Sequence, residues 1–531
     1  MLSSDEVLAA LTGLLQVILL LPVLLMLLSA SAVWFARNSP IRTQWGVGAA
    51  MALVIWIVSL LLRLGSDLNY QISVWQPSDM FSTPLSLALD TISWPIMYAV
   101  VTVLVAMIFT SASRETETNT GARVFWFLYS ASALLAILAD NLLSVVITWT
   151  LFDFLSAIFL ILIIGRDADI PKVVSRLSID LFGVLLILAG SVVGGDGNLR
   201  NPNQTPLSIF LLAIGAFVRL GLLPMRFNLP AFHSVRRGLG SLLRLIPPAI
   251  ALSFLARLFR AGIPDKTIAW FLVAGVGAAL IGCLRWMLET DAIVGRPYFI
   301  LGISGVGMLA AASMPGEFIA IVAAAVVILL AGAVLSLTVI HTPSHRVFSL
   351  GAALLLFGIP WLPASLLIHT ANLTTLTLWP GLIWVLIVII SLCMTILGSL
   401  HLYYAEEQSW RTSESLVRLT YGLGLSLPVF TSIGIGIQLR PNIDMWTWIL
   451  LGVQAVIVVV GYLAIRKLPE GTVGSLRFNI SSIDLEYLYR PIGQALGLVA
   501  KAMQALAGLI EGEAAILWIF AITIFLILAS G

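Results

Sequence analysis

The chain repeats one pattern almost from end to end, in which apolar runs are separated by short polar stretches. A run of roughly 20 apolar residues is long enough to cross the hydrocarbon core of a bilayer as a helix. The pattern therefore predicts about sixteen spanning helices, and the expected fold is an all-α polytopic membrane protein. The predicted spans lie near 7–35, 45–64, 86–110, 122–138, 141–164, 173–193, 206–235, 239–261, 267–288, 292–313, 316–340, 347–372, 379–404, 415–438, 446–465 and 513–530.

Composition excludes a water-soluble enzyme. Of the 531 residues, 60% are hydrophobic and only 10% are charged, whereas soluble domains carry about 25% charged residues. The net charge of +2 provides no basic field for nucleic acid. Cys283 and Cys393 both lie in apolar runs, and no nucleotide or metal motif occurs. We therefore expect no cofactor, no metal and no nucleic-acid partner.

The basic residues predict an orientation, because loops on the cytoplasmic side are enriched in Lys and Arg. With the N-terminus placed outside, 20 basic residues fall on the inner side and 6 on the outer side. Arg219 and Arg244 are left inside spans. This asymmetry predicts that both termini lie outside.

One stretch near the C-terminus, residues 466–512, is too polar to cross. Between 483 and 509 its apolar residues recur every three or four positions, which is typical of an amphipathic helix lying in the membrane interface. This helix is either a simple connector or a strap that contacts a partner. The predicted organisation has six parts: 1–120, 121–265, 266–405, 406–465, 466–512 and the last span, 513–531.

A few ionisable residues fall inside spans, where charge is costly and usually functional. Asp153 belongs either to an ion path or to a structural pair with Arg219 or Arg244. Asp180 near one end of its span is read as structural, and His369 near a helix end is read as a hydrogen-bonded interface residue. Arginine stays protonated at any relevant pH, so Arg219 and Arg244 attract anions but do not pass on protons.

Two spans contain helix-breaking residues. Paired broken helices at matching positions are typical of inverted repeats around a transport route, and these spans are five apart, as expected if 121–265 is repeated by 266–405. Ordinary proline kinks are the alternative. The breaking residues are Gly221, Pro224 and Pro230 in the seventh span and Gly358, Pro360 and Pro363 in the twelfth.

The order of several motifs resembles the antiporter-like, proton-translocating membrane subunits of respiratory complex I, membrane-bound hydrogenases and multi-subunit sodium/proton antiporters. The resemblance runs from about residue 85 to the end of the chain. Its motifs are Leu-Ala-Leu-Asp-Thr-Ile-Ser at 87–93, Asp-Asn-Leu-Leu at 140–143 followed by Trp149 and Ser156, the stretch from Arg219 to Pro230, Gly-Ile-Pro at 358–360, and Asp-Leu-Glu-Tyr-Leu-Tyr-Arg at 484–490.

The chain departs from this family at the positions that carry protons. The family's glutamate falls on Thr150, with Asp153 one helical turn later as a substitute. Its broken-helix lysine falls on Arg219, and the next base falls on Arg244. The polar residue expected after the second break falls near His369. The resemblance implies ion-translocation roles for these five positions.

The resemblance implies a membrane-arm subunit, such as one of an NADH-quinone oxidoreductase, that helps move protons or sodium when a partner module drives it. Such a subunit is not itself catalytic, and its partners are other membrane-arm subunits and the lipid bilayer. The expected location is the cell inner membrane. Two alternatives remain: a non-pumping structural subunit, and a membrane partner in inorganic-carbon uptake.

Overall fold

A computed structural model describes most of the chain. The described residues are 18–64, 67–72, 84–113, 120–164, 170–194, 205–222, 238–289, 291–313, 318–339, 343–369, 379–400, 414–439 and 445–467. The predicted interfacial helix at 466–512 lies almost wholly outside these residues. The last predicted span, Pro224 and Pro230 lie fully outside them.

The described chain is predominantly helical, and thirteen of its helices are long and apolar enough to cross a membrane. The prediction of an all-α polytopic membrane protein is confirmed. The helices are α2 (Leu21–Phe35), α3 (Ile41–Leu61), α4 (Ser93–Ser111), α5 (Thr120–Leu138), α6 (Leu142–Ile164), α7 (Ile170–Gly194), α8 (Pro206–Leu220), α9 (Leu239–Ala261), α10 (Asp265–Leu288), α11 (Ala292–Ser313), α12 (Ile319–Leu337), α13 (Arg346–Leu354), α14 (Ala364–His369), α16 (Trp379–Leu400), α17 (Ser415–Leu439) and α18 (Met445–Lys467), with short 3-10 helices η1 (Ala36–Asn38), η2 (Leu62–Leu64) and η5 (Pro343–His345).

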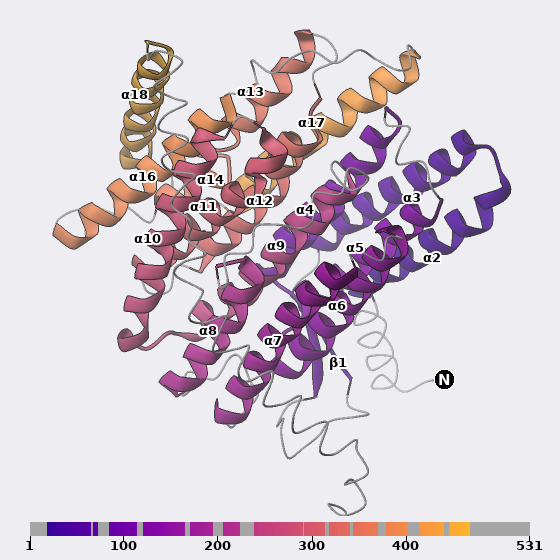
Figure 1. Ribbon diagram of the computed structural model, residues 1–531, viewed down its shortest axis with the longest axis horizontal. Helices are drawn as coiled ribbons and strands as arrows, with labels where there is room; N and C mark the ends of the chain where they lie inside the picture. The colour runs from indigo at the N-terminus through magenta and orange to yellow at the C-terminus, as the bar shows by residue number, and fades with distance from the viewer. Residues whose placement is uncertain are drawn as a thin grey trace, which may run out of the picture. The chain divides into compact units, whose positions relative to one another are not determined.

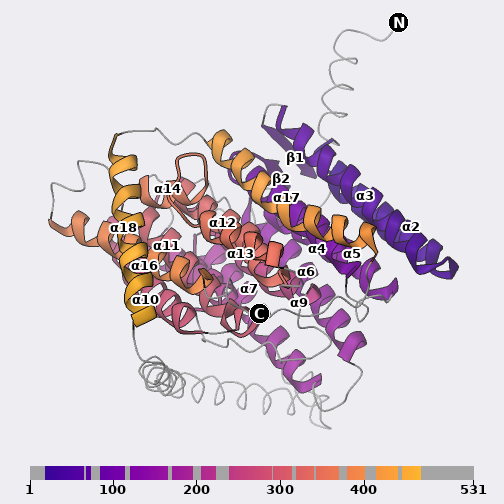
Figure 2. The same ribbon diagram turned by 90° about the horizontal axis from the view of Figure 1, so that it is seen from above.

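Three helices form the centre of the described bundle. The most apolar 18-residue stretch is 94% buried in each of α4, α9 and α12. The corresponding stretch of α18 is only 22% buried. A helix that is apolar on all sides needs other helices or lipid around it. Figures 1 and 2 accordingly show α2 and α3 along one edge of the bundle and α10, α16 and α18 along the opposite edge.

A two-stranded hairpin precedes α4, which corrects the predicted span at 86–110. Strands β1 (Leu68–Ile72) and β2 (Leu85–Leu89) pair antiparallel, with Leu68 opposite Leu89. β2 continues the apolar run of the helix, so hydropathy alone merged the two. The helix begins only at Ser93, and Asp90 caps the turn that leads into it: Oδ1 accepts the N–H groups of Ile92 at 3.2 Å and Ser93 at 2.9 Å.

The helical path is interrupted in both spans that contain the helix-breaking residues. α8 ends at Leu220, where Gly221 takes the left-handed conformation with φ +77°. In the later span, α13 ends at Leu354 and α14 begins at Ala364, so Gly358, Pro360 and Pro363 lie in a non-helical segment.

Gln454 on α18 supplies hydrogen-bond partners for the backbone of this second break. The N–H of Gly358 donates to Gln454 Oε1 at 2.9 Å, and Gln454 Nε2 donates to the carbonyl of Leu356 at 3.4 Å. Gln454 is fully buried on α18. One side chain therefore satisfies both a donor and an acceptor that the break releases inside the bundle.

Candidate functional site: a buried ion pair and a polar network at the end of the bundle

Asp153 on α6 and Arg219 on α8 form an ion pair inside the bundle. Arg219 Nη2 donates to Asp153 Oδ2 at 2.5 Å, and the two side chains are 2% and 3% exposed. Arg219 occupies the last turn of α8, just before the helix ends at Gly221. The last turn of α8 therefore places the cation inside the bundle, where an unpaired charge is costly.

Aromatic rings surround the arginine of this pair. The guanidinium carbon of Arg219 lies 4.2 Å from the centroid of the Trp149 ring and 5.7 Å from that of Phe152. Trp149 and Phe152 come from the same helix as Asp153, so α6 supplies both the counter-charge and the π faces. A desolvated cation–π contact contributes about 2 kcal/mol. The site holds its cation by charge and by aromatic contact together.

A second, looser pair lies on the neighbouring helix α7. Arg176 Nε lies 3.5 Å from Asp180 Oδ2, at i and i+4 on one helical face. Arg176 Nη2 also donates to the carbonyl of Leu243 on α9 at 3.4 Å. Both charges lie close enough to act electrostatically on Asp153. The buried pair of α6 and α8 and the partly exposed pair of α7 therefore lie in one region of the bundle.

Two of the remaining predicted positions make other contacts in the described part of the chain. Arg244 on α9 donates to the carbonyl of Ile293 on α11 at 3.3 Å. The Thr150 hydroxyl donates to the Val146 carbonyl of its own helix at 2.7 Å. His369 is the last residue of α14, and its side chain lies outside the described part. Within the described residues, no group of His, Cys, Asp or Glu is arranged to hold a metal ion.

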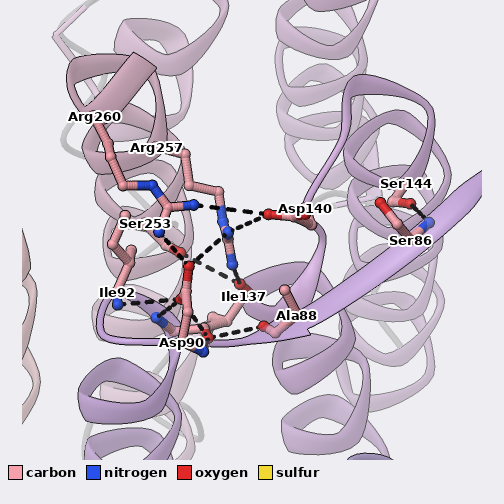
Figure 3. A network of polar contacts seen from close by, with 11 residues as sticks. Ser86, Ala88, Asp90, Ile92, Ile137, Asp140, Ser144, Ser253, Arg257 and Arg260 are labelled. Carbon is pink, nitrogen blue, oxygen red and sulfur yellow. Dashed lines mark hydrogen bonds and ion pairs between the residues drawn. The ribbon is translucent and has the colours of Figure 1, made fainter. Parts of the chain in front are cut away.

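A separate network of charges lies at one end of the bundle (Figure 3). Arg257 Nη1 contacts Asp140 Oδ1 at 2.7 Å and Asp90 Oδ2 at 3.3 Å. Arg260 Nη1 contacts Asp90 Oδ2 at 2.6 Å. These residues come from the end of β2, the α5–α6 junction and the last turns of α9. The network therefore ties together three segments that are distant in sequence.

The charge network opens onto a cavity of about 570 Å³, which Asp67 also lines. Burial alone would raise the pKa of Asp90, but the charge of Arg257, the Ser93 N–H and Arg260 together lower it to about 2. Asp90 is therefore ionised at any physiological pH.

This network was not predicted from the sequence, because charged residues are common at the ends of spans, near the lipid headgroups. A weak signal was present: Arg257 and Arg260 are spaced i, i+3 on one face of a span, and acids follow the apolar runs at 85–89 and 120–138. Spacing of this kind reports that two bases share a face but does not report what they contact.

The described helices define a polytopic helical membrane protein. Among solved structures, the chain is similar to a chain of the membrane-bound sulfane sulfur reductase, an archaeal respiratory membrane complex. The TM-score is 0.65 at 14% identity, over 96% of this chain and 99% of that one.

The chain is also similar to one in the Mrp complex from Dietzia sp. DQ12-45-1b. The TM-score is 0.62 at 16% identity, over 92% of this chain, which spans 62% of the Mrp chain. No family model matches the sequence, and no curated protein matches it either. Identity at this level shows the fold, and the fold expected from the resemblance is confirmed.

Proposed function

We propose that the chain is an antiporter-like subunit of a multi-subunit membrane complex and takes part in proton or sodium translocation driven by a partner module. The observation that carries the proposal is the buried Asp153–Arg219 pair. The fold likeness to chains of a respiratory complex and of an Mrp complex supports it. On this proposal the complex lies in the cell inner membrane, and its driving module is an NADH-quinone-type or related oxidoreductase or an antiporter assembly.

The chemistry of the pair assigns the two partners different roles. Arg219 keeps its charge, so Asp153 is the only member that can change protonation. An isolated carboxylate is costly in a dry interior, whereas a neutral carboxylic acid or a cation-bound carboxylate is not. Movement of Arg219 away from Asp153 is therefore coupled to uptake of a proton or sodium ion, and its return expels that ion.

The test uses the complex that co-purifies with the tagged chain, reconstituted into vesicles with its own electron donor or an imposed ion gradient. Asp153→Asn is expected to lower transport at least about tenfold, which corresponds to about 1.4 kcal/mol of activation free energy. Glu414→Gln is the matched control, because Glu414 forms an exposed pair with Arg42 far from this site and its loss should leave transport unchanged.

Removal of one partner leaves the other buried without its counter-charge and destabilises the protein. A second variant, Asp153→Asn with Arg219→Gln, removes both charges and keeps hydrogen-bonding groups at both positions. It is expected to assemble and still fail to transport. Undiminished transport by both variants would instead identify the chain as a structural subunit. Identification of the co-purified proteins shows whether the partner is an oxidoreductase module, a set of antiporter subunits or a carbon-uptake protein.

A further inference from the structure

The helices around the ion pair carry polar atoms that are buried but not hydrogen bonded. Helices α5, α6, α7 and α8 pack in succession, and each carries at least one such atom. No hydrogen-bond partner for any of them is present among the described residues. They include Tyr129 Oη on α5, Trp149 Nε1 on α6, Arg176 Nη1 on α7 and Arg219 Nε on α8.

Tyr129 is the one of these four residues that carries a hydroxyl group. Its side chain is fully buried, and its ring centroid lies 4.7 Å from that of Phe152, the residue before Asp153. Its hydroxyl lies within electrostatic range of Asp153 and Arg219, and of the Arg176–Asp180 pair on α7. Tyr129 therefore packs beside the helix segment that carries Asp153.

A buried hydroxyl without a partner costs stability, because it has lost its hydrogen bonds to water and gained none. Phenylalanine would fill the same space among Phe125 and Phe152 without that cost. A native group of this kind calls for a specific explanation. A second arrangement of the site, in which the hydroxyl has an acceptor, provides one.

Asp153 is the acceptor that becomes free in such an arrangement. In the structure its carboxylate is bound by Arg219, and this pairing is what the proposed function requires to break. We propose that Tyr129 is a positioning residue for Asp153, whose hydroxyl donates a hydrogen bond to the Asp153 carboxyl group when Arg219 releases it. The inference rests on the proposed function and adds the group that holds Asp153 in the separated state.

A neutral donor suits this role better than another cation. A carboxyl oxygen accepts a hydrogen bond in both the ionised and the protonated form, so Tyr129 holds the side chain in place without dictating its charge. The aromatic ring, fixed between Phe125 and Phe152, keeps the hydroxyl in position. Removal of the hydroxyl alone should therefore impair translocation and leave the packing intact.

The experiment compares Tyr129→Phe with the parent complex in reconstituted vesicles. Transport is expected to fall about tenfold, with the melting temperature unchanged or slightly raised. The matched control is Tyr421→Phe on α17, where the lost hydroxyl is bonded to the Val339 backbone. That control should lower the melting temperature and leave transport per folded complex unchanged.

A spectroscopic measurement separates positioning from simple packing. Infrared difference spectra of the complex should contain a carboxyl C=O band of Asp153, identified by its loss in Asp153→Asn. Loss of a donated hydrogen bond weakens polarisation of the carbonyl, so the band should shift to higher frequency in Tyr129→Phe. An unshifted band, or unchanged transport, would overturn the inference.

A double variant keeps the two proposals distinguishable. If Tyr129 acts through Asp153, adding Tyr129→Phe to Asp153→Asn should lower transport no further than Asp153→Asn alone. An additional loss would place the hydroxyl in another role and contradict the inference. If Asp153→Asn impairs transport and Tyr129→Phe does not, the proposed function stands and this inference fails. If neither does, the proposed function fails first.

Discussion

Individual charges in this bundle differ in what they are able to do. Arg219 and Arg257 are both almost fully buried and both paired with aspartate. Among the described residues Arg219 has one acidic partner, so its departure leaves a single carboxylate without its ion-pair partner. Arg257 shares Asp90 and Asp140 with Arg260, so the loss of one contact leaves others in place. The first arrangement suits an ion pair that separates, and the second suits a charge network that stays intact.

The charge network gives a pH-dependent prediction for Asp90→Asn. The folded-state pKa of Asp90, about 2, lies below the ordinary value of 3.8 for an aspartate side chain. Its ionisation therefore stabilises the fold fully above about pH 4, and that contribution is lost as pH falls through 2. At neutral pH it amounts to about 2 kcal/mol. Asp90→Asn should lower the free energy of unfolding by about this amount at pH 7, measured in detergent.

The same variant supplies its own control across pH. The difference between Asp90→Asn and the parent protein should shrink as pH falls below 4 and be small below about pH 2, where both side chains are mostly neutral. A difference that stays constant with pH would show that Asp90 acts through hydrogen bonding as the cap of α4, independently of its charge.

At the residue scale, the sequence predicted the members of the buried pair but not the network. Asp153 and Arg219 stand out because each interrupts an apolar run, and a charge in that setting needs a partner. Asp90, Asp140 and Arg257 lie at span ends, where a charge is unremarkable in sequence. Only the packing of β2, the α5–α6 junction and α9 brings them together.

At the scale of elements, long apolar runs predicted helices well because their periodicity and length are local properties. The hairpin was missed because β1 and β2 are stable only when paired, and Leu68 and Leu89 are too far apart for local patterns to report. The helix break at Gly358 was visible through its Gly and Pro residues. Its partner Gln454, on a span far along the chain, was not.

Gln454 gives a prediction about that break. Gln454→Met keeps the side-chain volume but leaves the Gly358 N–H and the Leu356 carbonyl without their partner, which costs about 1–3 kcal/mol. Hydrogen exchange of peptides covering 355–363 should become faster, and the melting temperature should fall. Gln454→Glu keeps an acceptor for Gly358 and should protect that amide better than methionine does.

The control for this element is Gln438→Met on α17, where the side chain is only partly buried. Exchange in 355–363 should match that of the parent protein. Equal protection of this segment in Gln454→Met would mean that neighbouring backbone and Ser365, whose hydroxyl donates to Leu362, hold the break without help from α18.

At the scale of the whole molecule, long-range contacts agree with the number of crossings in the described part. Arg42, at the start of α3, contacts Glu414, just before α17, at 2.7 Å. The predicted topology places an even number of spans between them. Asp90, Asp140 and Arg257 are likewise separated by even numbers of predicted spans and meet at one end of the bundle. An odd miscount between these points would have put the contacting residues on opposite faces.

Which face is cytoplasmic then depends on the basic residues, 20 against 6 in the predicted loops. Asn38 and Gln71 are exposed at opposite ends of α3, so single cysteines there test the orientation. Cys283 and Cys393 are buried and should give little background labelling. A membrane-impermeant maleimide should label Gln71→Cys in intact cells, and Asn38→Cys only after the membrane is opened. The reverse pattern would mean that the protein has the opposite orientation in the membrane, with the cavity beside Arg257 on the cytoplasmic side. Labelling of both positions in intact cells would contradict a spanning α3.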